Sequence, residues 1–214
     1  MSTPLKKFRS EVLTDVSGVP GSLIDRHILR AAIEFCDYTL TWREKFIQTT
    51  DEGVMQCLLT PDEGSRVVTV LYVGDDGVKV APATESRLDD TMTGWRDADN
   101  DSASAQYYFL EDRETLSLVL TPDAERSVEV VACLKPTQDA TELHDDLYED
   151  HIEALGYGAK ARLFAMPAKP WSNPELAMYF KKQFEDAKDK EKAERLNDYT
   201  RESSLIVRPH NYYG

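Results

Sequence analysis

The spacing of apolar residues changes twice along this chain, and these changes limit the folds it can adopt. Over residues 22–43, apolar side chains recur every three or four positions, which is typical of an amphipathic helix. Between residues 45 and 134, short runs alternate with a period of two, as in β-strands. Helical spacing returns at residue 145. The pattern therefore predicts an α+β protein in which a β module interrupts a helical part.

The first helix is predicted over residues 22–43. It follows a turn at Val19-Pro20-Gly21, and Ser22 with Asp25 has the S-x-x-D spacing of a capped helix start. The residues expected on its buried face are Ile24, Ile28, Ala31, Ala32, Phe35, Thr39 and Trp42.

Short strands separated by turn residues follow this helix. The turn Gly74-Asp75-Asp76-Gly77 joins two of them in a hairpin. The strands are expected over residues 45–50, 66–73, 78–82, 106–110, 115–120 and 127–134, with 54–59 as a further candidate and a short helix over 85–92. Such a set favours a small sandwich or a partly open barrel.

Two more helices are predicted after the strands. The first covers residues 145–166, where Gly156 and Gly158 lower helix propensity and imply the close approach of another helix. Asn173 caps the second, with Pro174 at its first position. The apolar positions of this last helix are Leu176, Phe180, Phe184 and Ala187. Beyond Lys188 almost every residue is charged, so this half is expected to project from the body.

The three helices are expected to form one bundle from residues 1–44 and 135–203. Residues 45–134 are then an inserted antiparallel β module, and 204–214 an extended C-terminal tail. The tail holds the apolar and aromatic residues Leu205, Ile206, Val207, Tyr212 and Tyr213, which suit docking to a partner subunit. A last strand on the chain's own β module and an unbound end are the alternatives.

Charge and composition exclude several classes of protein. Lys and Arg number 25 against 39 Asp and Glu, so the net charge is −14, which argues against a dedicated nucleic-acid binder. No apolar run reaches the ~18 residues of a membrane span, and the N-terminus is charged where a signal peptide is apolar. The three cysteines, Cys36, Cys57 and Cys133, are expected to be reduced, buried thiols.

The stretch 136–159 contains no Lys or Arg but seven acidic residues. One interpretation is a solvated face. The other is a surface that keeps polyanions from binding. The acidic residues are Asp139, Glu142, Asp145, Asp146, Glu149, Asp150 and Glu153.

The sequence lacks the common enzyme motifs for acyl transfer, phosphate binding, dinucleotide binding and zinc proteolysis, so no catalytic or cofactor-binding residue is assigned. His144 and His151 would share a face of a continuous helix, but acidic residues also favour a helix start without any metal. Asp97, Asp99 and Asp101 resemble the start of a calcium loop, whose pattern then fails at Ser102 and Tyr108. No metal site is therefore predicted, and an enzyme is the less favoured interpretation.

Three segments carry a resemblance to a known family. They are IEFCDYTLTWRE at 33–44, YYFLEDRETLSLVLTPD at 107–123 and the long segment from Leu134 to Ala187, which contains AMPAKPWSNP. In these segments the chain resembles the head-to-tail adaptor proteins of tailed bacteriophages, over residues 10–195.

The resemblance implies a non-enzymatic virion protein that is assembled in the host cytoplasm. About twelve copies would form a ring under the portal protein, extend the DNA channel without specific DNA binding, and support a tail or nozzle protein below. It implies no cofactor, and no membrane partner is expected. A tail-tube or gatekeeper protein of similar fold is the alternative.

Overall fold

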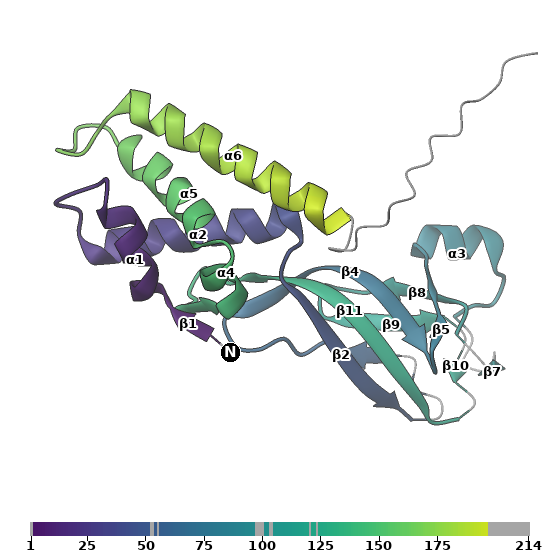
Figure 1. Ribbon diagram of the computed structural model, residues 1–214. Coiled ribbons are helices and arrows are strands. Elements are labelled where there is room, and N and C mark those ends of the chain that lie inside the picture. The colour runs from purple at the N-terminus through teal and green to yellow at the C-terminus, as the bar shows by residue number, and fades with distance from the viewer. Residues whose placement is uncertain are drawn as a thin grey trace, which may run out of the picture.

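The computed structural model describes residues 2–51, 54, 56–96, 101–102, 105–119, 121–122 and 124–196, with the backbone alone at 101–102, 121–122 and 196. Helices α1, α2, α4, α5 and α6 lie together on one side of the molecule, and two β-sheets with helix α3 lie on the other (Figure 1). Two apolar cores correspond to these two sides, and a third small cluster lies under α3. The protein is therefore mixed α+β, as predicted.

The helical side is built on α2 (Gly21–Thr39), α5 (Ile152–Phe164) and α6 (Pro174–Leu196), each of which contacts the other two. The structure adds α1 (Leu5–Leu13), which packs against α2 and α5 and was not predicted. Its buried residues Leu5, Phe8 and Val12 have helical spacing, a signal that the charged neighbours Lys6, Lys7 and Arg9 obscured.

Helix α5 lies at the centre of the helical side. Nine of its thirteen residues are buried, including Gly158, Ala159 and Lys160. Small residues here let the neighbouring helices approach closely. A Cβ on Gly158 would lie 2.8 Å from the Cβ of Ala31 on α2 and 3.0 Å from Cε2 of Phe184 on α6. On Gly156 it would overlap the side chain of Glu11 on α1.

The start of the first helix is confirmed to within one residue, but its predicted cap and its last turn are wrong. Helix α2 starts at Gly21 behind Pro20, and no side chain caps it; Asp25 instead accepts hydrogen bonds from Arg9 of α1. The helix ends at Thr39 because Leu40 takes a left-handed conformation with φ 55°. Trp42 is therefore beyond the helix, where it contacts both the helical and the β cores. The other predicted core positions of this helix are buried.

The β side consists of two four-stranded sheets that share one core. The first has the order β2-β11-β4-β5, from Arg43–Thr50, Arg126–Pro136, Ser65–Asp75 and Val78–Lys79. The second has the order β3-β9-β8-β6, from Gln56–Leu58, Thr115–Val119, Tyr107–Leu110 and Ala81–Pro82. Five of the six predicted strands and the predicted hairpin of β4 with β5 are confirmed, and 54–59 contributes the three-residue β3.

The predicted strand 78–82 is divided between the two sheets. Residues 78–79 (β5) continue the hairpin with β4, and residues 81–82 (β6) pair in parallel with β8 of the second sheet. The buried Val80 lies between them. Helix α3 (Glu85–Thr91) follows and confirms the predicted short helix, and the Thr84 side chain caps it. A two-residue parallel pair joins β7 (Asp101–Ser102) to β10 (Thr121–Pro122).

The predicted helix 145–166 is wrong as one continuous element. It is replaced by α4 (Asp145–Glu149) and α5, and β12 (Glu142–His144) directly precedes them. Strand β12 pairs with β1 (Ser2–Pro4), which brings the N-terminus against this segment. The break falls at His151, whose φ of −127° and ψ of 11° are not helical. The stripe from Leu147 to Leu155 is thus shared by two helices, both of which bury it in the helical core.

Candidate assembly surfaces

The C-terminal half of α6 is anchored to the start of the β side, so the prediction that it projects was wrong. Glu191, only 6% exposed, accepts a hydrogen bond of 2.6 Å from Thr41 and one of 3.1 Å from Arg195. Arg195 also donates to Thr41, and Arg43 donates to the Arg195 carbonyl. Composition predicted a solvated helix because it does not reveal which charges pair across elements.

A second group of charges joins α6 to α2 and α5. The Lys188 ammonium, 4% exposed, lies 2.7 Å from Glu34 and 2.9 Å from Glu185. Burial lowers the pKa of Lys188, but hydrogen bonds with these two carboxylates raise it overall. Glu34 also pairs with Arg162 of α5. These contacts hold the three helices in one relative position.

One flank of α6 borders a basic face. It is formed by Arg26 and Arg30 of α2, Arg162 of α5, and Lys181 and Lys188 of α6, with Glu34 and Glu185 as the carboxylates among them. In the described part of the chain, Arg26, Arg30 and Lys181 have no carboxylate within ion-pairing distance. A groove of about 360 Å³ runs along this face, lined also by Ala161, Ala165, Ala177, Met178 and Phe184.

His27 lies within this basic face and is kept neutral. It is 7% exposed, and neither ring nitrogen has a hydrogen-bond partner among the described residues. Burial, followed by the charges of Arg30, Arg162 and Arg26, lowers its pKa to about 4. The arginines near this neutral ring form a local excess of positive charge in a protein whose net charge is −14.

The opposite flank of α6 borders an acidic groove of about 650 Å³. Its charged lining is Asp146, Asp150, Glu153, Glu191 and Glu194, with Lys190 and Arg195 as the basic side chains, and its apolar lining is Phe35, Ala154, Tyr157 and Ala187. His151 lies in the same groove, 3.7 Å from Glu191, and burial lowers its pKa below the ordinary value. The groove holds part of the acidic stretch 136–159.

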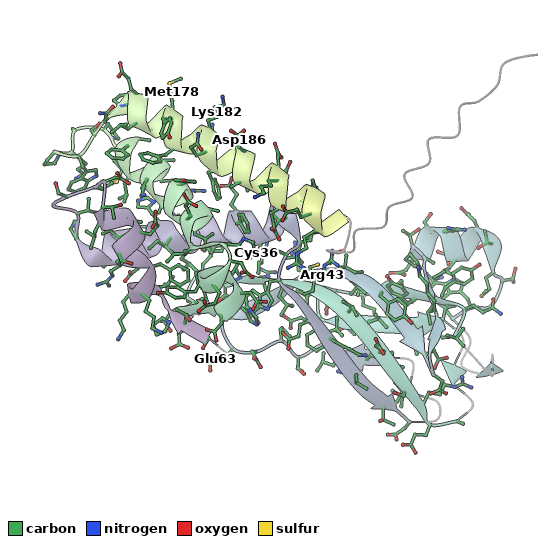
Figure 2. The ribbon with its side chains drawn as sticks, in the orientation of Figure 1. Cys36, Arg43, Glu63, Met178, Lys182 and Asp186 are labelled. Atoms are coloured by element: carbon green, nitrogen blue, oxygen red, sulfur yellow. The ribbon has the colours of Figure 1, made fainter. Side chains whose placement is uncertain are left out.

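The outer surface of α6 exposes large apolar side chains. Met178 is 75% exposed and Tyr179 56%. Met178, Lys182 and Asp186 point away from the helical core along this helix (Figure 2). The predicted core residue Leu176 is also exposed, and Ala177 is buried in its place beside Phe180 and Phe184. The cap by Asn173 is confirmed, since its side chain accepts from the amides of Glu175 and Leu176.

The histidines considered for metal binding occupy separate places. His144 precedes α4, where its ring accepts a hydrogen bond from the amide of Asp146 and lies 5.2 Å from the ring of Trp42. His151 contacts Phe35 instead. Across the residues whose side chains are described, no group of three or more His, Cys, Asp or Glu is arranged to hold a metal ion.

Several predicted residues lie outside the described part of the chain. Among them are Asp97 and Asp99 of the candidate calcium loop and the whole tail segment, with Leu205, Ile206, Val207, Tyr212 and Tyr213. The backbone of Asp101 begins β7. The three cysteines are buried and free, as expected. Burial raises the pKa of the Cys57 and Cys133 thiols to about 11, so neither is a reactive thiolate at neutral pH.

A further cavity, of about 580 Å³, lies under α3 at the far end of the β side, and Trp95, Arg96 and Phe109 are among its lining residues. The polar side chains that line this cavity bond to neighbouring residues. Glu111 accepts from Gln56 and Ser117, and Arg96 pairs with Glu85 and Asp89. The segment after α3 contacts the second sheet through Trp95 and Phe109, whose ring centroids are 5.4 Å apart. No helix in the described residues is long and apolar enough to cross a membrane.

The described residues thus form charged and apolar surfaces suited to partners. The family model described as SU10 adaptor protein matches residues 5–208, nearly the whole chain. The protein belongs to this family of phage head-to-tail adaptors, so it is a virion component and a head–tail connector protein. The family is structural, and its members join portal and tail proteins. No curated protein sequence matches the chain.

Proposed function

We propose that this adaptor forms a homo-oligomeric ring of about twelve copies under the portal, with a closed head-to-tail arrangement of subunits. The observation that carries the proposal is the family match over residues 5–208. The exposed Met178 and Tyr179 on α6 support it, because large apolar side chains on a surface helix are typical of an interface. Assembly takes place in the host cytoplasm.

The two sides of the molecule have different roles in this proposal. The helical part, residues 1–44 and 135–203, builds the ring, and Gly156 and Gly158 set the helix spacing that gives the ring face its shape. The inserted β module, residues 45–134, contacts neighbours outside the ring and provides the platform for a tail or nozzle protein. The helical side and the β side lie at opposite ends of the molecule, which agrees with this division of roles (Figure 1).

The DNA passes through the ring without specific binding. Each phosphate that a protein neutralises adds salt-dependent affinity, so a channel wall should carry few accessible cations. The exposed carboxylates Asp139, Glu142 and Glu149, from the stretch without Lys or Arg, are the candidates for the channel wall. Tight DNA binding by the free protein at physiological salt would contradict this part of the proposal.

The tail over residues 204–214 docks to a partner subunit, with the portal as the first candidate. Leu205, Ile206 and Val207 suit strand addition or a groove, and Tyr212 and Tyr213 suit anchoring in pockets.

Size-exclusion chromatography with light scattering tests the ring directly. The chain is measured alone and after mixing with purified portal protein. A complex in which the adaptor and portal elute together, with a mass that corresponds to about twelve adaptor copies, is expected. An adaptor that stays monomeric and elutes apart from the portal would contradict the proposal.

A further inference from the structure

We infer that the two flanks of α6 are the two halves of one contact between copies of this chain, in which the basic face of one copy meets the acidic groove of the next. The inference rests on the proposed ring and says which surfaces close it.

The exposed charges of the two flanks are opposite in sign. The groove of the first flank is lined by Arg162 and Lys181 with Glu34 and Glu185, and Arg26, Arg30 and Lys188 add positive charge near it, whereas the acidic groove has five carboxylates and two basic side chains. Glu34 and Glu185 are already occupied by Lys188 and Arg162. Arg26, Arg30 and Lys181 are exposed, so they are the charges available to a partner. In the groove, the exposed Asp150 is available in the same way.

Each flank also combines an apolar centre with this charged rim. The basic face has Ala161, Ala165 and Phe184 in its groove, with the exposed Met178 beside them. The acidic groove has Phe35, Ala154 and Ala187. An apolar centre with a polar rim is the usual anatomy of a protein–protein interface. The charges would choose the partner and its orientation. Phe35, Phe184, Ala154 and Ala161 are already buried within the chain, so the apolar area of the contact would come from Met178, Ala165 and Ala187.

The two flanks lie on opposite sides of one helix. Met178, Lys181 and Glu185 follow one another at three- and four-residue spacing along the first flank. Ala187, Glu191 and Glu194 do the same on the second flank. A copy docked on one side of α6 therefore leaves the other side open for a further copy.

The separation of charge favours a ring over a two-fold dimer. In a two-fold contact, the same patch of both copies meets itself, so either flank would place like charges together. A head-to-tail contact pairs the basic face of one copy with the acidic groove of the next. It leaves one basic face unpaired at one end of the row of copies and one acidic groove unpaired at the other end. Such a contact propagates until the rotation closes it, which is the geometry of a ring.

Charge reversal on each flank tests the inference. One variant carries Arg30→Glu and Lys181→Glu, and the other carries Asp150→Lys and Glu194→Lys. Placing like charges across the contact should raise the concentration needed for half-assembly at least about tenfold in each variant. Light scattering with portal protein measures it, and thermal unfolding confirms that each variant is folded.

A mixture of the two variants gives the sharper readout. In the mixture, the reversed face of one variant fits the reversed groove of the other, and their two unchanged surfaces also fit. An alternating ring can then close whenever the number of copies is even. We expect neither variant to assemble alone and the equimolar mixture to assemble near the wild-type concentration.

A matched control reverses two exposed charges on the β side, Lys79→Glu and Arg87→Glu, and should assemble as the wild type does. Assembly of either single-flank variant at the wild-type concentration would overturn the inference. So would folded variants that fail alone and also fail when mixed, because the two flanks would then not meet each other. In both cases a wild-type ring would leave the proposed function intact. A wild-type chain that never forms a ring would contradict the proposed function itself.

Discussion

The helical side and the β side of this adaptor bury polar groups in different ways. The helical side encloses Lys160, Lys188, Glu191 and His27, and the first three pair with groups on other helices or on the link to β2. On the β side, the buried charge is Asp75, which accepts hydrogen bonds from the amide of Ala105 at 2.9 Å and from Arg126 at 3.3 Å. The other buried polar residues of the sheets in the described part of the chain, Thr50, Ser65 and Ser117, are uncharged.

This difference shows which interactions fix the relative positions of the strands on one side and of the helices on the other. In the sheets, backbone pairing and alternation of side chains determine which residues face the core. Helices have no such ladder between them, so their relative positions depend on side chains. Close contacts at Gly158 and cross-helix ion pairs such as Lys160 with Glu11, at 3.0 Å, determine these positions. Changes on the helical side should therefore alter assembly more readily than changes in the sheets.

The largest loss of stability is expected from Asp75→Ala on the β side. The carboxylate is 1% exposed, and its removal leaves the Arg126 guanidinium, 10% exposed, without this buried partner. Breaking a buried pair from one side typically costs about 3–5 kcal/mol. Chemical denaturation measures the loss. Hydrogen exchange should show faster opening of the sheets with α2, α5 and α6 still protected. Equal loss of protection on both sides would show that the two sides unfold as one unit.

The corresponding change on the helical side is Glu191→Ala. It removes the acceptor shared by Thr41 and Arg195, and we expect a loss of about 2–3 kcal/mol, because this cluster lies nearer the surface than Asp75. The matched control is Lys45→Ala, which breaks the exposed pair with Glu129 and should cost less than about 1 kcal/mol. If both variants lost the same stability, the junction between α6 and β2 would not be anchored by Glu191.

The two glycines of α5 are expected to differ in their response to a methyl group. Gly158→Ala places a Cβ against Ala31 and the Phe184 ring, which can move only with their helices, so overpacking should cost about 1–3 kcal/mol. Gly156→Ala meets the flexible side chain of Glu11, which can rotate away, so its cost should be smaller. Melting temperatures of both variants, with Ala193→Leu on the exposed side of α6 as the control, measure this. A larger loss at Gly156 would contradict it.

His27 predicts a pH dependence on the helical side. Its folded pKa of about 4 lies below the unfolded value of 6.5, so the unfolded chain binds the proton more readily. The neutral ring therefore favours the folded state above pH 6.5, and this advantage is lost as the pH falls from 6.5 toward 4. Between pH 7 and 5.5 the wild type should lose about 1 kcal/mol that His27→Leu does not lose. Because the pKa of His151 is also lowered, His151→Gln serves as the comparison variant. An unchanged pH slope in His27→Leu would contradict the prediction.

The sequence predicted most elements of the β side because its strands are short, β-branched and bounded by turn residues. Val67, Val73, Val128 and Val130 alternate into the core as their period required. The helical side was harder to predict. Periodicity cannot show that Leu40 ends α2, that His151 interrupts a helical stripe, or that Lys188 and Glu191 are paired rather than solvated. Those outcomes depend on partners distant in the sequence, such as Thr41 with Glu191.

The candidate assembly surfaces could likewise be predicted only in part, because they combine residues that are distant in the sequence. The absence of Lys and Arg over 136–159 pointed to an acidic surface, and the fold brings Asp146, Asp150 and Glu153 from that stretch to Glu194 of α6. The basic face gave no comparable signal, because Arg30, Arg162 and Lys181 come from three separate helices. A spacing analysis within one element could not have found it.

The smallest effect on stability is expected from deleting residues 204–214. This deletion distinguishes the stability of the monomer from its attachment to a partner. If the tail docks to a partner, its removal should leave the monomer's melting temperature nearly unchanged while abolishing co-elution with the portal. Leu205 is nine positions after Leu196, so it can lie up to about 30–32 Å from the end of α6.

Two further measurements separate the alternatives for this tail. Leu205→Asp with Val207→Asp removes its apolar character at constant length, and should weaken attachment as the deletion does if side chains rather than length anchor it. A deletion variant that still forms connectors at wild-type yield would show that the tail is not the anchor. A large fall in the monomer's melting temperature would instead place the tail on the chain's own β side. Assembly would then depend on the flanks of α6 rather than on the C-terminal residues.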